Sequence, residues 1–92
     1  MQIWKLTLAV QDVQRLELPA GAGILTVQIQ GGEPQLWALC DENAITKEPR
    51  HIAIYGTGNP MPDEAGDYIA TFQMLGGAAV FHAFEVKHDQ EG

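Results

Sequence analysis

The sequence predicts an all-β fold, a small antiparallel meander that forms a sandwich or open barrel of six or seven strands. Apolar and polar residues alternate over short runs, which is the two-residue period of a strand rather than the spacing of a helix. Ten glycines and five prolines separate these runs. Because 92 residues leave room for one domain, we expect a single β domain at residues 1–87 and a polar C-terminal tail at 88–92.

The first two strands are expected at residues 3–10 and 15–18, where apolar side chains recur at every second position. Pro19 ends the second strand, because proline cannot donate a backbone hydrogen bond within a sheet. The short turn at 11–14 predicts that these two strands pair with each other as a hairpin.

A second hairpin is expected from residues 24–30 and 35–40. Leucine, valine and isoleucine alternate with threonine and glutamine along its first strand. The segment Gly31-Gly32-Glu33-Pro34 supplies the turn, since glycine adopts the positive φ that tight hairpin turns need.

The middle of the chain is expected to be mostly irregular. Residues 41–50 are polar and predict an exposed loop with at most one helical turn, and residues 51–55 predict a short strand. Residues 56–67 are too rich in glycine and proline for a helix or a strand. A loop this long in so small a domain is often functional.

The last hairpin, residues 68–75 and 78–86, is closed by the two-residue loop Gly76-Gly77, which determines its register. One side carries the core pairs Phe72 with Phe81, Met74 with Ala79, and Ala70 with Ala83. The other side carries Ile69 opposite Phe84, Thr71 opposite His82, and Gln73 opposite Val80. This second side mixes polar and apolar groups, as a binding surface or a subunit interface does.

Both faces of the strand at 78–86 carry apolar side chains, and one small sheet does not easily cover both. We therefore expect a homo-oligomer, most simply a dimer, with Val80, His82 and Phe84 at the interface.

Composition limits the partners and the location. Five Lys and Arg against twelve Asp and Glu give a net charge of −7, so polymeric nucleic acid would meet a repulsive field. Cys40 is the single cysteine, which excludes an intrachain disulfide and fits a reducing cytoplasm. The N-terminus alternates apolar with polar residues and reaches Asp12 before any long apolar run. We expect no signal peptide, no membrane contact and a cytoplasmic protein.

The chain carries no recognisable catalytic or metal-binding set. It has no serine, and acidic residues follow Cys40, which disfavours a thiolate nucleophile. His51, His82 and His88 lack the spacing of metal ligands. We therefore predict a protein that is not an enzyme, with no catalytic residues, no metal and no cofactor. For His82 two interpretations stay open: a structural hydrogen bond to Thr71 or a contact to a ligand.

The segment Tyr55-Gly56-Thr57-Gly58-Asn59-Pro60 is a candidate ligand loop, because its glycines let successive backbone N–H groups converge on an anion or a base edge. It is neither a dinucleotide fingerprint nor a P-loop, since Pro60 and Pro62 prevent the helix that both require. A plain tight turn is the alternative interpretation.

Five motifs occur in order along the chain: Ile3-Trp4-Lys5; Leu36-Trp37-Ala38-Leu39; Ile54-Tyr55-Gly56-Thr57-Gly58 with Pro60; Tyr68-Ile69 with Thr71-Phe72-Gln73; and Gly76-Gly77-Ala78 before Val80-Phe81-His82 and Phe84-Glu85. Together they resemble a family of small phage and bacterial proteins known as a domain of unknown function. The resemblance covers residues 3–85. Members commonly carry histidine where this chain has Asn59.

The resemblance implies a non-catalytic, phage-type anti-defence protein, similar to the anti-CBASS nucleotide sponges that bind a cyclic oligonucleotide or an ADP-ribose signal. The ligand would sit against the loop at 55–60, with Lys47 or Arg50 at its phosphate and an aromatic ring on its base. The candidate ligand-binding residues are Trp37, Lys47, Arg50, Tyr55, Gly56, Thr57, Gly58, Asn59, Thr71, Gln73 and His82. The alternatives are a protein-binding module that inhibits a host enzyme, and a structural virion protein.

Overall fold

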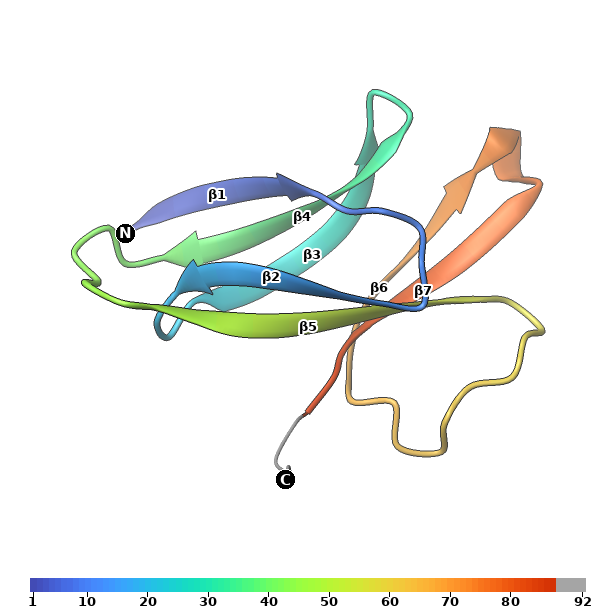
Figure 1. Cartoon of the computed structure of the whole chain (residues 1–92). Helices are drawn as coiled ribbons and strands as arrows, with labels where there is room; N and C mark the ends of the chain where they lie inside the picture. The colour runs from blue at the N-terminus through green and yellow to red at the C-terminus, as the bar shows by residue number, and fades with distance from the viewer. Residues whose placement is uncertain (88–92) are drawn as a thin grey trace.

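The computed structural model describes residues 1–87 and confirms the all-β fold (Figure 1). The tail expected at 88–92 lies outside the described residues. The strands are β1 (Gln2–Thr7), β2 (Val13–Pro19), β3 (Gly23–Gln30), β4 (Glu33–Cys40), β5 (Lys47–Gly56), β6 (Asp67–Met74) and β7 (Ala79–Glu85), with a short 3₁₀ turn, η1 (Leu75–Gly77), between the last two.

The strands form two antiparallel sheets that do not close into a barrel. One sheet has the order β1-β4-β3 and the other the order β2-β5-β7-β6. The strands β3 and β6 lie side by side, with Cα atoms of the two strands within 8 Å, but they belong to different sheets. We call the gap between their facing edges the seam.

The expected hairpin between the first two strands is wrong. β1 pairs with β4, and β2 pairs with β5 in the other sheet. Gln14 bonds both the N–H and the C=O of Ala9 with its side-chain amide, at 2.9 and 2.6 Å, and so holds the turn that carries the chain from one sheet to the other. In this arrangement the apolar faces of β1 and β2 are buried in one core between two sheets, which a two-stranded ribbon alone would not achieve.

The loop expected at 41–50 is too long, and the strand expected at 51–55 is too short. β5 begins at Lys47 and pairs with β2 along that whole added length, up to Lys47 opposite Pro19. The polar composition of this stretch indicated a loop, but pairing with a distant strand supplies backbone hydrogen bonds that outweigh local propensity.

The pairing of the other two hairpins is confirmed, and β6 pairs with β7 in the predicted register around Gly76-Gly77. The turn expected at 31–34 is too long, because Glu33 and Pro34 already pair with β3, and a bulge between Ile24 and Thr26 leaves Leu25 exposed instead of on the face of Val27 and Ile29. In the β6–β7 hairpin one position differs: a bulge between Tyr68 and Ala70 places Tyr68, rather than Ile69, opposite Phe84. The bulge therefore puts a tyrosine on the outer face of this sheet.

The core lies between the two sheets and draws on both of them. Its largest fully buried side chains are Leu18, Leu36, Ile52, Val27 and Cys40. Cys40 is a buried thiol within this core. Among residues 1–87, no helix is long and apolar enough to cross a membrane.

Candidate functional site

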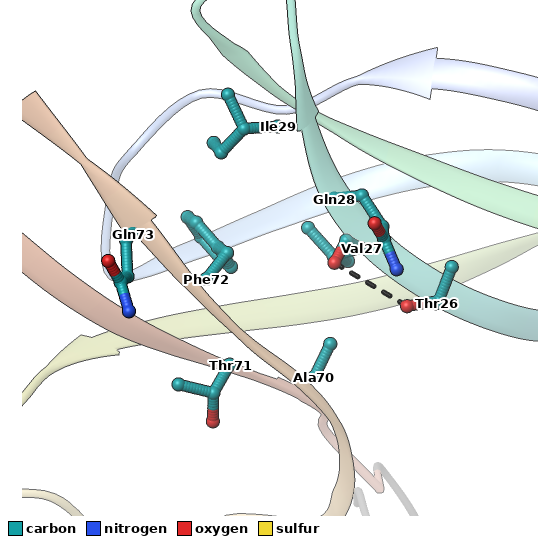
Figure 2. A pocket seen from close by; sticks show the side chains of 8 residues that line it. All are labelled: Thr26, Val27, Gln28, Ile29, Ala70, Thr71, Phe72 and Gln73. Atoms are coloured by element: carbon teal, nitrogen blue, oxygen red, sulfur yellow. Dashed lines mark hydrogen bonds between the residues drawn. The ribbon is translucent and has the colours of Figure 1, made fainter. Parts of the chain in front are cut away.

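A groove of about 330 Å³ runs along the outside of the seam (Figure 2). Four consecutive residues of β3 and four of β6 line it: Thr26, Val27, Gln28, Ile29, Ala70, Thr71, Phe72 and Gln73. Val27 and Phe72 are buried, whereas Gln28, Thr71 and Gln73 are exposed. The groove therefore has an apolar floor and rims of hydroxyl and amide groups.

Backbone groups also face this groove. In each hairpin the two-residue turn makes alternate residues exchange both backbone hydrogen bonds with the partner strand, and the residues between them point their N–H and C=O groups away. The registers place Val27 and Ile29 of β3, and Phe72 and Met74 of β6, in that second set. Because β3 and β6 do not pair, these groups have no strand partner. Val27 and Phe72 are buried, and the Val27 carbonyl accepts a hydrogen bond of 3.5 Å from Thr26 Oγ1 (Figure 2), whereas Ile29 is half-buried in the lining of the groove.

A second hollow, of about 350 Å³, continues from the groove onto the outer face of the three-stranded sheet. It lies between Trp37 of β4 and the outward side of β3, and its lining is Thr26, Gln28, Ile29, Gln30 and Trp37. Trp37 stands between its cross-strand neighbours Lys5 and Thr26. An aromatic surface thus borders a row of amide and hydroxyl groups.

Lys5 supplies the charge at this hollow. Its Nζ lies 5.6 Å from the centre of the Trp37 ring and donates a hydrogen bond of 2.6 Å to Oε1 of Gln30. That bond leaves the Gln30 amide nitrogen, a donor, directed to other partners. Among the described residues, neither the hollow nor the groove has a charged side chain in its lining. Lys5 therefore stands at the edge of an otherwise uncharged site.

On the other rim, four side chains form one hydrogen-bond chain. Tyr68 OH lies 2.8 Å from Thr71 Oγ1, which lies 2.9 Å from His82 Nδ1, and His82 Nε2 lies 2.7 Å from Thr57 Oγ1. Both ring nitrogens of His82 are thus bonded by threonine hydroxyls. The structural interpretation of His82, a hydrogen bond to Thr71, is confirmed, and the bond holds Thr71 in place at the groove.

The pair of Thr57 and His82 has the spacing of a nucleophile and its base. The third member decides what the pair can do. In catalytic triads a carboxylate stabilises the imidazolium that forms, whereas here the third group is the neutral hydroxyl of Thr71. The arrangement favours a positioning role for His82 over nucleophilic catalysis.

Replacing Thr71 with valine tests this hydrogen-bond chain. Valine keeps the strand propensity but removes the hydroxyl that joins His82 to Tyr68. We expect a loss of about 1 kcal/mol in unfolding free energy, or about 4–8 °C in melting temperature. Thr46→Val is the control, because Thr46 is exposed on a loop. Equal melting temperatures for the two variants would contradict the role of the chain.

Three aromatic rings lie together on the outer face of the four-stranded sheet, and one of them, Tyr68, is also a member of the hydrogen-bond chain. Phe84 is in edge contact with Tyr55 and with Tyr68, at centroid distances of 6.0 and 5.6 Å. The segment after Tyr55 turns tightly, since Asn59 N–H donates to the Gly56 carbonyl at 3.1 Å and Gly58 has a φ of 88°. The expected ligand loop at 55–60 therefore contains a tight turn.

The structure brings together only some of the predicted site residues. Tyr55, Thr57, Thr71 and His82 share the outer face of the four-stranded sheet, and Gln73 lies in the groove. Trp37 belongs to the other sheet and reaches the groove through the hollow beside β3. It does not adjoin the glycine loop as the sequence suggested.

Lys47 lies far from the glycine loop, although the two are close in sequence. β5 is one ten-residue strand, so its ends at Lys47 and Gly56 are about 30 Å apart at roughly 3.3 Å per residue. The Lys47 ammonium lies 5.6 Å from the centre of the Trp4 ring instead.

Arg50 binds groups of the protein itself. Its Nε and Nη2 donate to the two carboxylate oxygens of Glu85 at 2.5 and 3.1 Å, and its Nη1 donates to the Ala22 carbonyl at 2.7 Å. The hydrogen bond to Glu85 is the main reason why the pKa of Arg50 is raised above its ordinary value. These hydrogen bonds give the Arg50 guanidinium a role in holding the fold together.

Residues that the sequence reasoning missed complete the site: Lys5, Thr26, Gln28, Gln30, Tyr68 and Phe84. The turn expected at 31–34 would place Thr26 opposite Leu39, whereas the shorter Gly31-Gly32 turn of the structure places it opposite Trp37. Tyr68 was hidden by the bulge. In the part of the chain that the structure describes, no group of three or more potential metal ligands occurs; His88 lies outside that part.

No curated protein and no solved structure matches the chain. A family model does match, over residues 1–92, and its description is a domain of unknown function, DUF7352. The match covers the whole chain, so the protein belongs to the DUF7352 family.

Proposed function

We propose that this protein is a non-catalytic binding protein that sequesters a nucleotide signal, in the manner of a phage anti-defence sponge. The ligand would be a cyclic oligonucleotide or an ADP-ribose derivative. It would occupy the groove along the seam and the hollow beside Trp37, in place of the site at the 55–60 loop that the sequence suggested.

The observation that carries this proposal is the surface around Trp37. A half-buried indole borders a hollow of about 350 Å³, within the range of about 300–1,000 Å³ usual for small-molecule sites. Stacking of a base on an aromatic side chain contributes about 1–3 kcal/mol. The exposed amides of Gln28 and Gln30 supply donors and acceptors of the kind that read base edges.

Charge favours a small ligand over a polymer. The chain carries a net charge of −7, which repels an extended polyanion. At the site itself the lining is uncharged, and Lys5 stands beside Trp37 to bind a phosphate. The backbone N–H group of Ile29, which the register directs toward β6 and which belongs to the lining of the groove, adds a neutral donor for a further phosphate oxygen.

The first experiment is calorimetric titration with cyclic dinucleotides, cyclic trinucleotides and ADP-ribose derivatives. For the ligand that binds, Trp37→Ala should raise Kd about 10- to 100-fold through loss of the stacking surface. Trp37→Phe should retain part of the affinity. If no ligand of the panel binds tighter than millimolar, the proposal is wrong.

A matched pair of lysines tests the phosphate contact. Lys5→Gln should weaken the binding of a phosphorylated ligand more than the binding of the corresponding nucleoside, because only the phosphorylated ligand carries a negative charge that attracts the Lys5 ammonium. Lys87→Gln is the control, since Lys87 is paired with Asp67 at 2.9 Å, outside the lining of the site. Equal effects of the two substitutions would reduce the role of Lys5 to general electrostatics.

A sequestering protein releases its ligand unchanged. Equal amounts of protein and ligand are mixed and heated until the protein denatures, and the supernatant is then chromatographed. Recovery of intact ligand supports sequestration. Turnover of several equivalents would overturn the non-catalytic proposal and direct attention to Thr57 and His82.

One observation favours a second candidate function, a module that inhibits a host enzyme. The net charge of −7 suits a basic partner such as a nucleic-acid-binding enzyme. This candidate takes the lead if the nucleotide panel gives no binding.

A further inference from the structure

Leu75 has an unusual conformation and an unusual exposure. It is the residue other than glycine with a positive φ, 55°, within the described range 1–87. A side chain disfavours this left-handed conformation. Leu75 is also 80% exposed, so its side chain gains little from packing within its own chain. The turn hydrogen bond from Ala78 N–H to the Leu75 carbonyl, at 3.1 Å, holds this backbone conformation and presents the exposed side chain to a contact outside the chain.

A hollow of about 530 Å³ has Leu75 in its lining. It opens between the tips of the β3–β4 and β6–β7 hairpins, which stand at the same end of the molecule in Figure 1. Its lining residues are Ile29, Gly32, Gln73, Met74, Leu75, Gly76 and Gly77. Besides Leu75, its apolar side chains are those of Ile29 and Met74, which are both half-buried.

We propose that the hairpin tips, rather than the Val80, His82 and Phe84 surface expected from the sequence, form a dimer interface in which Leu75 of each copy enters the hollow of the other. Leu75 lines the hollow and is at the same time strongly exposed. The chain thus carries an apolar anchor and an apolar socket at one place, which is what a two-fold contact requires, since both partners use the same patch.

The distribution of charge permits a second copy at this place. Two chains of net charge −7 repel each other unless they meet where the charge is low. No charged side chain lines this hollow. The surface formed by Met74, Leu75 and the glycine turn is uncharged and apolar, and each copy would contact the other through this same surface.

The contact also bears on the proposed nucleotide site. The hollow shares Ile29 and Gln73 with the groove along the seam. In the dimer, Leu75 of the second copy would therefore close the end of the groove that Ile29 and Gln73 form. This last step rests on the proposed function, whereas the dimer itself does not.

Sedimentation velocity of the ligand-free protein tests the dimer separately from nucleotide binding. The wild type should approach twice the 10.0 kDa of one chain at high micromolar concentration. Leu75→Gly should raise the dimer dissociation constant about a hundredfold or more, because two buried leucines are lost from each dimer. Gln73→Glu should also weaken the dimer by placing a carboxylate in each socket.

The glycine variant separates a lost interface from a damaged fold. Glycine adopts positive φ without strain, so Leu75→Gly should melt at or above the wild type when both are diluted to monomers. Ile45→Ser is the control, because Ile45 is 97% exposed but lies on the loop after β4. It should dimerise like the wild type. A monomeric wild type, a dimeric Leu75→Gly, or an equal effect of Ile45→Ser would overturn the proposal.

Discussion

Arg50→Ala should lower the unfolding free energy by about 3–5 kcal/mol, the usual cost of removing one partner from a buried ion pair. The Arg50 and Glu85 side chains are 17% and 15% exposed, and their two hydrogen bonds join β5 to β7. Without the guanidinium, Glu85 would keep a poorly solvated charge with no partner, and the Ala22 carbonyl would lose a donor. The melting temperature should fall by more than about 10 °C.

The control for Arg50 is another arginine. Arg15 pairs with Glu17 at 2.7 Å, but those side chains are 63% and 48% exposed, so Arg15→Ala should cost less than about 1 kcal/mol. The double variant Arg50→Leu with Glu85→Leu should regain much of the loss, because no charge then stays unpaired. If Arg50→Ala and Arg15→Ala melt alike, Arg50 has no structural role and is again a candidate for the ligand.

Gly66→Ala should destabilise the fold by about 3 kcal/mol or more. Gly66 has a φ of 109°, and a Cβ there would lie 2.0 Å from the backbone oxygen of Glu85. Strain from positive φ costs roughly 1–2 kcal/mol, and a forced shift of packed backbone adds about 1–3 kcal/mol. Thermal denaturation followed by circular dichroism measures the loss.

Gly21→Ala separates these two contributions. Gly21 also has a positive φ, 77°, but a Cβ there would have no neighbour within 4 Å. This variant should lose only the backbone part, about 1–2 kcal/mol. Equal losses at both glycines would mean that the segment before β6 does not pack closely on β7.

Local turn chemistry explains why part of the fold could be predicted. Gly31-Gly32 and Gly76-Gly77 each have positive φ in the structure, as two-residue hairpin loops need. The alternation on either side then determines the partner of every residue, which is why the Thr71–His82 contact could be predicted. The two bulges, between Ile24 and Thr26 and between Tyr68 and Ala70, escaped, because an extra residue in a strand leaves little trace in the alternation.

The candidate site could be predicted only where it depends on one hairpin. Thr71, Gln73 and His82 come from β6 and β7, and their shared side follows from the register. Lys47 and Arg50 were grouped with the glycine loop by closeness in sequence, but a ten-residue strand separates Lys47 from that loop. Closeness in sequence is a poor guide along an extended strand, which gains about 3.3 Å with each residue.

By itself the sequence determined the all-β class, the two glycine-closed hairpins and the side chains on each face of the β6–β7 hairpin up to its bulge. These depend on alternation and turns, which act over a few residues. Only the tertiary structure decided that β1 and β2 belong to different sheets, that β5 extends back to Lys47, and that β3 and β6 face each other unpaired. The groove exists because two strands about forty residues apart meet there. Burial of the apolar faces of both sheets in one core brings these two strands together, and no local sequence pattern predicts that contact.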